Sequence, residues 1–564
     1  MVDIDAVRDW LGRLPGGSLV GRYVDDWDAF EKLDRPVVTL FGSYDTGKSS
    51  LLRRLLVDSG GDVPGWLTIS ARHETFEVND VEVGGCIIRD TPGFAVGASD
   101  IRAQNNSRRA MAAVGLTDVG IAVLTPQLAT AERDLLQKLF TQGWPVGSMW
   151  FVISRFDEAG VDPEYDLAEY RELSDRKVRE LRELFELDDR TPVFVVSQDA
   201  FQTAGPDTDL SRETWDDFRG WDGMRDLADA FEAVSPSALP GWRHTAGQRY
   251  WTAVLDETVT ELRRQLSDYT ARAEVAASGV ARRDVWESEL DTLDRAAQAS
   301  LDGLVEEVMR RSWEPSSGAD ELQAEIQRTL DEWFTKHEVR LQRLQQSIRK
   351  TKERERARPS WAGFASLVAT LGSGEDASTT PAGPGGAAEH VETVGTMLIG
   401  MLKAANNARG PIVGGKASSA KAAGDPGRHI GIAEAALPLA VYLAKVVDEQ
   451  GADRARLNQD KAAAEKRQQV VTECTERTRD TWQPFVDDVR EAIVAETRDQ
   501  VDLDASLRQL VEQLQEAVAE GEGLFRAGTF RCSRQGRKRV GHCGPTSGNG
   551  SDGWTPDRGR AAPR

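Results

Sequence analysis

Short apolar runs alternate with amphipathic stretches in the first part of the chain. Between about residues 35 and 234, runs such as PVVTLFG, VGIAVLTP, MWFVISRFD and PVFVVS are separated by stretches such as ATAERDLLQKLF. Strands that alternate with helices form a mostly parallel sheet with helices on both faces. The run TFEV, the turn ND and the run VEVGGCIIRD indicate a hairpin, which predicts one antiparallel edge strand.

The pattern becomes helical after the proline-rich break SPSALPGW at 235–242. In two long stretches, at about 245–356 and 453–520, apolar side chains recur at the spacing of one helical face. Two such segments separated by an insertion predict an antiparallel helical stalk. Their apolar stripes are interpreted as the core of that bundle, which is the usual role of this spacing.

The insertion between the two helical stretches is apolar and rich in Gly and Ala. It contains SWAGFASLVATLG, the flexible linker SGEDASTTPAGPGGAA and the segment IGIAEAALPLAVYLAKVV. An exposed apolar patch marks a lipid or a protein contact. The insertion is therefore either a tip that touches a membrane or a helical hairpin that packs on the stalk or a partner chain.

The last segment, from about residue 525, is rich in Arg and Gly and has no periodicity, so we expect it to be disordered. A shifted reading frame at the end of the gene, or a tail without function, is favoured over a basic lipid-binding tail. The expected units are an N-terminal helical segment at 1–34, an α/β domain at 35–234, a linker at 235–244, the first stalk part at 245–358, the insertion at 359–447, the return part at 448–524 and the tail at 525–564.

Composition narrows the class of protein. A chain of 564 residues with 40% hydrophobic and 29% charged residues is expected to form two or more soluble domains. The net charge of -22 argues against nucleic-acid binding, which needs clustered Lys and Arg. Four scattered cysteines form no disulfide framework and suit a reducing cytoplasm. We expect neither a signal peptide nor a membrane-spanning helix. The excess of Arg over Lys suggests a GC-rich bacterial genome.

The stretch GSYDTGKS, from Gly42 to Ser49, matches the phosphate-binding pattern G-x-x-x-x-G-K-[ST]. It follows an apolar strand and precedes the helical SSLLRRLL, so backbone N–H groups and a helix N-terminus can surround phosphates. Lys48 is expected to reach the β- and γ-phosphates and Ser49 to ligate Mg²⁺. The predicted nucleotide contacts in this loop are Gly42, Ser43, Tyr44, Asp45, Thr46, Gly47, Lys48, Ser49 and Ser50.

Two further motifs follow at the ends of predicted strands. DTPG places Asp90 where a carboxylate can hold a Mg²⁺-bound water, and Gly93 where its N–H can contact the γ-phosphate. In FVISRFDEAG, Asp157 can accept hydrogen bonds from guanine N1 and N2, a donor pair that adenine lacks. Ser197, in VVSQD, lies in a loop expected to contact the guanine O6.

These motifs, in this order, resemble the signature of the Ras-like P-loop GTPase superfamily between about Arg35 and Val234. The DTPG stretch looks most like the Era-type and dynamin-like branches. The resemblance implies the same roles for Lys48, Ser49, Asp90, Gly93 and Asp157, which are those argued above.

The base-reading motif departs from the usual Asn/Thr-Lys-x-Asp, because it reads Ser154-Arg155-Phe156-Asp157. The stem of Arg155 can still lie across the base and the P-loop. The departure leaves base specificity open, and an ATPase is the alternative if Asp157 does not read the base.

The catalytic groups are less directly indicated. The first-switch threonine that completes the Mg²⁺ shell is assigned to Thr75, with Thr68 second, although either can be an ordinary strand-edge residue. Phe94 stands where Ras-type enzymes place a water-orienting Gln, so catalytic help must come from a partner, dimerisation, a P-loop residue or a metal ion. Asp45 occupies the position where relatives coordinate a monovalent cation, K⁺ or Na⁺; alternatively it points to solvent. The predicted catalytic residues are Lys48, Asp45 and Thr75.

The order of segments resembles that of bacterial dynamin-like GTPases, including the LeoA type. The resemblance implies an α/β P-loop GTPase domain with a long α-helical stalk, which binds GTP or GDP with Mg²⁺ and couples dimerisation through the GTPase face to stalk movement. It also implies a cytoplasmic protein that contacts the inner face of the cell membrane through 360–447, or pairs with a second dynamin-like chain. A regulatory GTPase switch that docks a protein partner is the alternative, and an Era-type ribosome-assembly GTPase is disfavoured because no basic RNA-binding module follows the domain.

Overall fold

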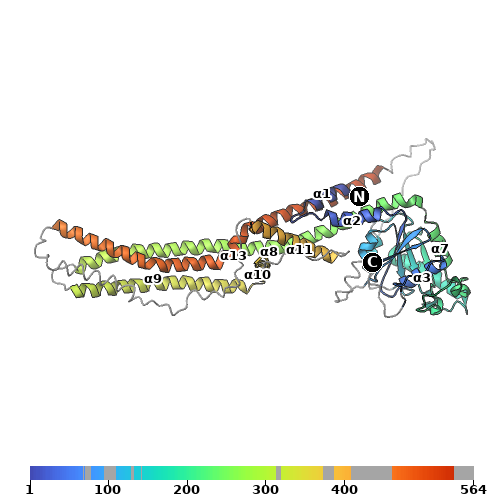
Figure 1. The fold of residues 1–564 in the computed structure, drawn as a ribbon, viewed down its shortest axis with the longest axis horizontal. Helices are drawn as coiled ribbons and strands as arrows, with labels where there is room; N and C mark the ends of the chain where they lie inside the picture. The colour runs from blue at the N-terminus through green and yellow to red at the C-terminus, as the bar shows by residue number, and fades with distance from the viewer. Residues whose placement is uncertain are drawn as a thin grey trace, which may run out of the picture.

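The computed structural model describes residues 1–67, 69, 78–94, 110–128, 133–140, 143–234, 236–312, 319–372, 387–407 and 460–538. An α/β domain lies at one end of a long helical region (Figure 1). Thr68 and Thr75, the two candidates for the first switch, lie outside the described residues. So do 373–386 and 408–447 of the insertion, 448–459 of the return part and 539–564 of the tail.

The described strands form a six-stranded sheet in the order β2-β3-β1-β4-β5-β6. Their bounds are Val37–Phe41 for β1, Asn79–Val83 for β2, Cys86–Asp90 for β3, Val119–Leu124 for β4, Met149–Ile153 for β5 and Val193–Val195 for β6. The pairing of β2 with β3 is antiparallel, and the other pairings are parallel. The predicted mostly parallel sheet with an antiparallel edge strand is therefore confirmed.

The hairpin turn differs from the predicted one. Asn79 and Asp80 are part of β2, and the chain reverses at Gly84 and Gly85 instead. Both glycines have positive φ, 56° and 80°, which a two-residue hairpin turn with its right-handed strand twist requires. The expected turn at ND was wrong because Gly adopts this conformation at lower cost than Asn or Asp.

Helices cover both faces of the sheet, as predicted. They are α3 (Lys48–Asp58), α5 (Arg133–Phe140), α6 (Leu167–Phe185) and α7 (Met224–Glu232), with 3₁₀ turns η1 (Phe156–Ala159), η2 (Ala200–Gln202), η3 (Arg212–Phe218) and η4 (Pro236–Ala238). One apolar core contains side chains of α3 and α7, and the other contains side chains of α5 and α6. The central strands β1, β4 and β5 are buried throughout, which explains why their sequences are continuous apolar runs.

The helical region is built around two very long helices that run side by side (Figure 1). They are α8 (Leu239–Ser312) and α13 (Asp460–Lys538). The shorter helices that pack beside them are α1 (Ile4–Gly12), α2 (Val20–Glu31), α9 (Ala319–Arg356), α10 (Pro359–Gly372) and α11 (Ala387–Asn407). At 74 residues, α8 is about 110 Å long. The predicted helical stalk is confirmed.

Two segment boundaries differ from the expected ones. Most of the linker expected at 235–244 belongs to α8, because Pro240 lies in the first helical turn, where its missing N–H removes no hydrogen bond. At the other end of the helical region, α13 continues past residue 524 to Lys538.

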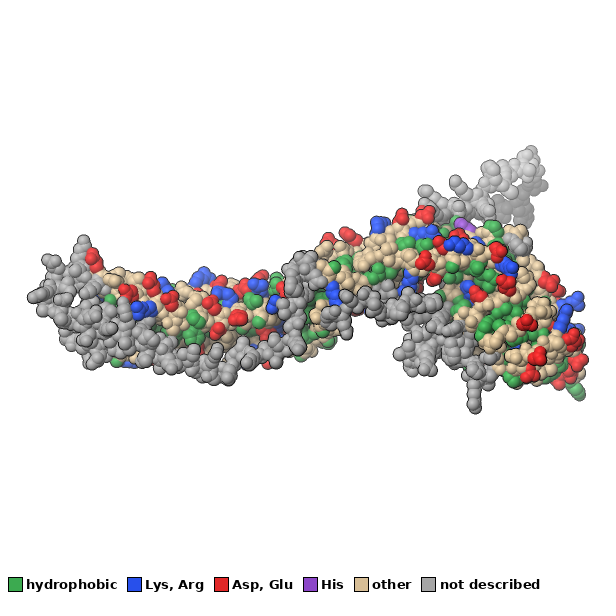
Figure 2. Space-filling view, in the orientation of Figure 1, with side chains coloured by type: hydrophobic (Ala, Val, Ile, Leu, Met, Phe, Trp, Pro, Cys, Tyr) green, Lys and Arg blue, Asp and Glu red, His purple; other side chains and the backbone are tan. Residues whose placement is uncertain are grey.

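Two apolar cores stabilise the helical region. The proximal core, nearer the α/β domain, joins α1, α2, α10 and α11 to the first part of α8 and the last part of α13. The distal core joins α9 to the later part of α8 and the earlier part of α13. Acidic and basic side chains are interspersed over the visible outer face of both parts (Figure 2).

The described part of the insertion lies within the proximal core. Phe364 and Leu367 of α10, and Leu398 and Leu402 of α11, are buried there. Met397 of α11 also lies against the backbone of the turn between α1 and α2. These helices therefore follow the packed-hairpin alternative rather than the exposed-tip alternative. Among the described helices, none is long and apolar enough to span a bilayer.

The domain and the stalk meet at Arg243, near the start of α8. Its Nε donates to Asp118, which precedes β4, and its Nη1 donates to Phe30 O and Leu33 O at the end of α2. Its Nη2 donates to Arg35 O just before β1, at 2.9 Å. One buried guanidinium thus connects the stalk to the α2 terminus and to the entrance of two central strands.

Replacing Leu398 with Ala tests whether α11 is held by the proximal core. Leu398 is 0% exposed, and removing it is expected to destabilise the bundle by about 2–5 kcal/mol. Amide hydrogen exchange over 387–407 should accelerate. The exposed mid-helix substitution Gly400→Ala is the control, and it should leave exchange unchanged or slow it. Equal exchange in the Leu398→Ala variant and the wild type would contradict this packing.

Candidate nucleotide site

The P-loop spans the turn from β1 to α3, and two of its positions have the positive φ that favours glycine. Gly42 has φ +154°, and a Cβ there would collide with Val123 O of β4. Gly47 has φ +80° and begins α3, and a Cβ there would collide with the Gln198 amide. The motif's glycines are therefore required by close approach of neighbouring loops as well as by the turn itself.

Lys48 lies inside this loop and is buried. Its Nζ donates to Ser43 O at 2.8 Å and lies 3.4 Å from Gly42 O. The Thr46 hydroxyl also donates to Ser43 O, and Ser154 Oγ, after β5, donates to Thr46 O at 2.6 Å. Ser154 was predicted as part of the base-reading motif, and here its hydroxyl fastens the P-loop to the end of β5.

The two predicted Mg²⁺ ligands from different motifs are adjacent. Ser49, in the first turn of α3, has its Oγ 2.7 Å from Asp90 Oδ2 at the end of β3. The parallel pairing of β1 with β3 places Asp90 beside Leu40, one residue before the strand reaches Phe41 and the loop. A hydroxyl and a carboxylate are hard oxygen donors, so this pair suits Mg²⁺. Thr75, the third predicted ligand, lies outside the described residues.

The DTPG segment packs directly against the P-loop. Phe94 N donates to Gly42 O at 3.0 Å. The Phe94 ring is 1% exposed and lies edge-on to Phe41, with ring centroids 6.2 Å apart. This side chain anchors the segment in the core and brings no polar atom to the nucleotide side. A Cβ on Gly93 would lie 2.7 Å from Tyr44 Cα, so glycine is needed for this contact.

Asp45 and Arg155 form an ion pair at the mouth of the loop. Arg155 Nη1 lies 3.2 Å from Asp45 Oδ2 and donates to Asp45 O at 3.1 Å. The Arg155 stem lies close to Gly47, so it crosses the P-loop as expected. The Asp45 side chain is 74% exposed, and exposed ion pairs contribute little stability. The Asp45 carboxylate therefore faces solvent and is also paired with the Arg155 guanidinium.

Asp157 lies in η1, where hydrogen bonds hold both its backbone and its side chain. Its backbone N donates to Ser197 Oγ at 2.9 Å, and Ser197 Oγ is 3.1 Å from the Tyr170 hydroxyl. The Asp157 Oδ2 accepts from Phe201 N at 3.0 Å. Burial raises the pKa of the Asp157 carboxyl, and the hydrogen bond from Phe201 N–H opposes that rise. Ser197 thus shapes the backbone around Asp157.

Gln198 also belongs to this site, although no motif in the sequence indicates it. Its Oε1 accepts from Arg155 N at 3.0 Å, while its amide nitrogen lies against Gly47. Gln198 therefore joins the P-loop to the base-reading motif. It directly follows Ser197, but no known spacing of the motif indicates a role for its side chain.

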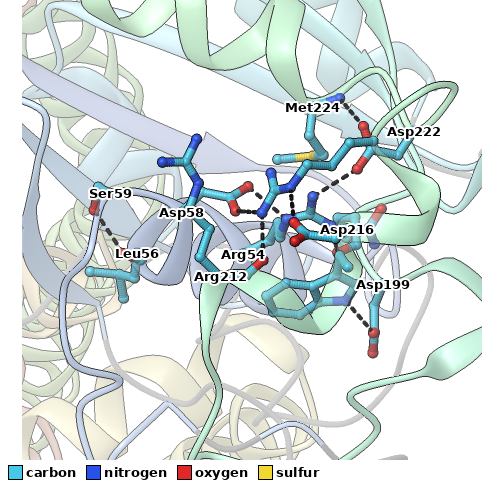
Figure 3. A network of polar contacts seen from close by, with 12 residues as sticks. Arg54, Leu56, Asp58, Ser59, Asp199, Arg212, Asp216, Asp222 and Met224 are labelled. Atoms are coloured by element: carbon cyan, nitrogen blue, oxygen red, sulfur yellow. Dashed lines mark hydrogen bonds and ion pairs between the residues drawn. The ribbon is translucent and has the colours of Figure 1, made fainter.

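Two buried arginines of α3 were also missed. Arg54 donates to Asp58 at 2.6 Å and to Asp222 at 2.7 Å, and its guanidinium lies 4.4 Å from the centre of the Trp215 ring (Figure 3). Arg53 pairs with Asp199 at 3.0 Å. In LLRRLL the leucines form the buried face, so periodicity predicts exposed arginines. The segment 199–222 covers them instead, and its carboxylates compensate the buried charges.

The arrangement brings together the parts needed to bind a nucleoside triphosphate. Lys48 and Ser49 begin α3 after the loop that follows β1, Asp90 ends β3, and Asp157 follows the end of β5. The carboxyl edge of a parallel sheet is where such folds bind ligands. The roles assigned to these residues stay predictions.

No protein-family model matches the chain, and a search of curated proteins found no match. Among solved structures, the LeoA bacterial dynamin GTPase from ETEC is 15% identical, with 92% of this chain and 97% of LeoA covered at a TM-score of 0.27. A structure of an oligomerised bacterial dynamin pair, described as sensing and tethering membranes, is 9% identical, with 92% and 93% covered at a TM-score of 0.37.

Aquifex aeolicus Era, solved with GDP and AlF₄⁻, is 22% identical with a TM-score of 0.22. That match covers 29% of this chain and 51% of Era, so the chain aligns with about half of Era's length. The chain is thus similar to bacterial dynamins along most of its length and to Era over a shorter part.

Gly93→Ala tests the contact between DTPG and the P-loop. The added Cβ meets the Tyr44 backbone at 2.7–2.8 Å, so the two segments must separate. We expect a stability loss of about 1–3 kcal/mol and weaker binding of a non-hydrolysable GTP analogue, measured by calorimetry. Gly65→Ala, where a Cβ would enter open space, is the control. Wild-type affinity in the Gly93 variant would show that this contact is dispensable.

Proposed function

We propose that this chain is a dynamin-like GTPase that binds and hydrolyses GTP and couples its nucleotide state to a long helical stalk. The observation that carries this proposal is the 2.7 Å approach of Ser49 Oγ to Asp90 Oδ2 beside the buried Lys48. A hydroxyl and a carboxylate from two separate motifs meet there, and Lys48 directly precedes Ser49 in the same loop, which is what a phosphate and metal site requires.

Each residue has a defined task in this proposal. Lys48 leaves the carbonyls of Gly42 and Ser43 to bind the β- and γ-phosphates, while the P-loop N–H groups surround the phosphate oxygens. Ser49 and Asp90 would hold Mg²⁺, which would supply positive charge to offset the negative charge of the phosphates. Gly93 N–H meets the γ-phosphate.

Recognition of the base is assigned to Asp157. Its carboxylate accepts from guanine N1 and N2, and the Arg155 stem covers the base beside Gly47. The loop of Ser197 contacts the guanine O6. These tasks make GTP and GDP the ligands rather than adenine nucleotides.

Hydrolysis requires a group that the Phe94 side chain does not provide. We assign this help to dimerisation across the nucleotide face, to Thr75 in the first switch and to a monovalent cation near Asp45. Arg155 Nη1 lies 3.2 Å from Asp45 Oδ2, at the carboxylate where such a cation would bind. K⁺ or Na⁺ binding would thus compete with this ion pair and free Arg155 for the base.

The stalk carries the mechanical part of the proposal. GTP-dependent self-association, or pairing with a second dynamin-like chain, changes the orientation of the stalk, and hydrolysis reverses the change. We place the protein in the cytoplasm, attached peripherally to the inner face of the cell membrane through the insertion at 360–447. This attachment requires the apolar faces of α10 and α11 to leave the proximal core. The second candidate is a regulatory switch that docks a protein partner without remodelling membranes, and the buried apolar faces of α10 and α11 favour it.

The dependence of GTPase rate on protein concentration separates these two functions. For a dynamin-like enzyme, specific activity should rise several-fold with concentration because catalysis requires dimerisation, and liposomes should raise it further. Rates are measured in K⁺, Na⁺ and choline buffers, with Lys48→Ala as the inactive control. A specific activity independent of concentration favours the switch, and equal rates in the three buffers remove the cation proposal.

Asp157→Asn tests guanine recognition. The amide keeps the size of the side chain but cannot accept both guanine hydrogen bonds, so GTP affinity should fall about tenfold or more. ATP affinity, measured by competition with a fluorescent nucleotide, should not change. Tighter binding of ATP than GTP by the wild type would instead support the ATPase alternative.

A further inference from the structure

The segment 199–205, here called the base loop, contacts the carboxylate that is assigned to guanine. Its Phe201 N–H donates to Asp157 Oδ2 at 3.0 Å. Two neighbouring rings, Phe218 and Trp221, hold the Phe201 side chain with centroid distances of 5.8 and 5.9 Å. The position of the Phe201 amide therefore sets the direction in which the Asp157 carboxylate points.

The base loop adopts an unfavourable backbone conformation at this point. Phe201 has φ 55° and Gln202 has φ 56°, in the left-handed region that residues other than Gly rarely enter. Such a conformation persists only where surrounding contacts enforce it, and it is common at ligand-binding positions.

Arg53 of the P-loop helix is the main restraint on the loop. Its Nη1 donates to Gly205 O at 2.7 Å and to Asp207 O at 3.0 Å. Its Nη2 donates to Asp199 Oδ2 at 3.0 Å. The other oxygen of Asp199 accepts from Ala204 N and from the Trp215 indole. Both ends of the base loop are thus attached to one side chain that is 1% exposed.

We propose that Arg53 is a positioning residue for guanine recognition. Through Asp199 it holds the base loop in its strained form, so that the Phe201 amide orients the Asp157 carboxylate toward guanine N1 and N2. This inference rests on the proposed function, because it assumes that Asp157 reads guanine. Arg53 itself touches neither the base nor the phosphates.

The position of Arg53 on α3 also connects the two ends of the nucleotide site. Arg53 lies one helical turn after Ser49 on α3, so the same helix carries the metal-binding hydroxyl and the restraint on the base loop. The phosphate end and the base end of the nucleotide are therefore read by parts that are fastened together. A bidentate guanidinium suits this task, because a lysine ammonium cannot reach two backbone carbonyls and a carboxylate in the same geometry.

The ratio of GDP to IDP affinity measures this positioning directly. IDP lacks the guanine N2 amino group and so loses one hydrogen bond to Asp157. The wild type should bind GDP about tenfold or more tightly than IDP, as expected when a hydrogen bond to a charged group is lost. In Arg53→Lys and Asp199→Asn the ratio should fall toward one, with IDP affinity changing much less. Calorimetric titration of the full chain with each nucleotide and Mg²⁺ gives both constants.

A merely structural role would lower both affinities together and leave the ratio unchanged. Arg219→Lys is the control, because Arg219 pairs with Asp58 and Asp216 beside the same network without contacting the base loop. Asp199→Asn carries the test if Arg53→Lys fails to fold, as judged by circular dichroism.

Two outcomes separate this inference from the proposed function. A high wild-type ratio that both variants retain overturns the role of Arg53 alone. A wild-type ratio near one removes the guanine-reading role of Asp157, and the positioning role falls with it.

Discussion

Buried arginines near the start of α8 connect the domain to the stalk: Arg249 donates to Thr117 O, and the guanidinium of Arg243 makes the larger set of contacts. It is bonded to the Asp118 carboxylate at 2.8 Å and to carbonyls at the end of α2 and before β1. Asp118 in turn accepts from Val37 N, the first residue of β1. Burial raises the pKa of Asp118, while Val37 N–H and Arg243 counteract it. Losing one partner of a buried pair of this kind typically costs about 3–5 kcal/mol.

The position of this contact matters because β1 is only five residues long. Its first residue shares Asp118 with Arg243, and its last residue precedes the P-loop. The nucleotide site and the root of the stalk therefore lie at opposite ends of one short buried strand. The sheet is close-packed and deforms little, so β1 is a rigid connection between these two points.

The apolar composition of the insertion suggests an exposed apolar surface, but the apolar side chains of its described helices are buried. Its described helices already bury their apolar side chains against α8 and α13, with Leu398 and Phe364 at 0% and 1% exposure. Contact of these faces with lipid would require α10 and α11 to leave the proximal core. Moving these faces from the core to lipid would exchange one apolar environment for another. It would also expose the facing apolar side chains of α8 and α13 to water, which costs about 25 cal/mol for each Å² exposed.

The sequence by itself determined the sheet type, the helical stalk and the P-loop, because these follow from local periodicity and from residues adjacent in the chain. It also assigned Ser49 and Asp90 to one metal site, since the loop after β1 that leads to Ser49 and the end of β3 at Asp90 both lie at the carboxyl edge of parallel strands. Only the tertiary structure decided that Arg53 and Arg54 are buried, that Gln198 bridges two motifs, and that α10 and α11 return to the proximal core. Each of these depends on segments far apart in the chain, such as 199–222 lying over α3, and no pattern within a single helix records what covers it.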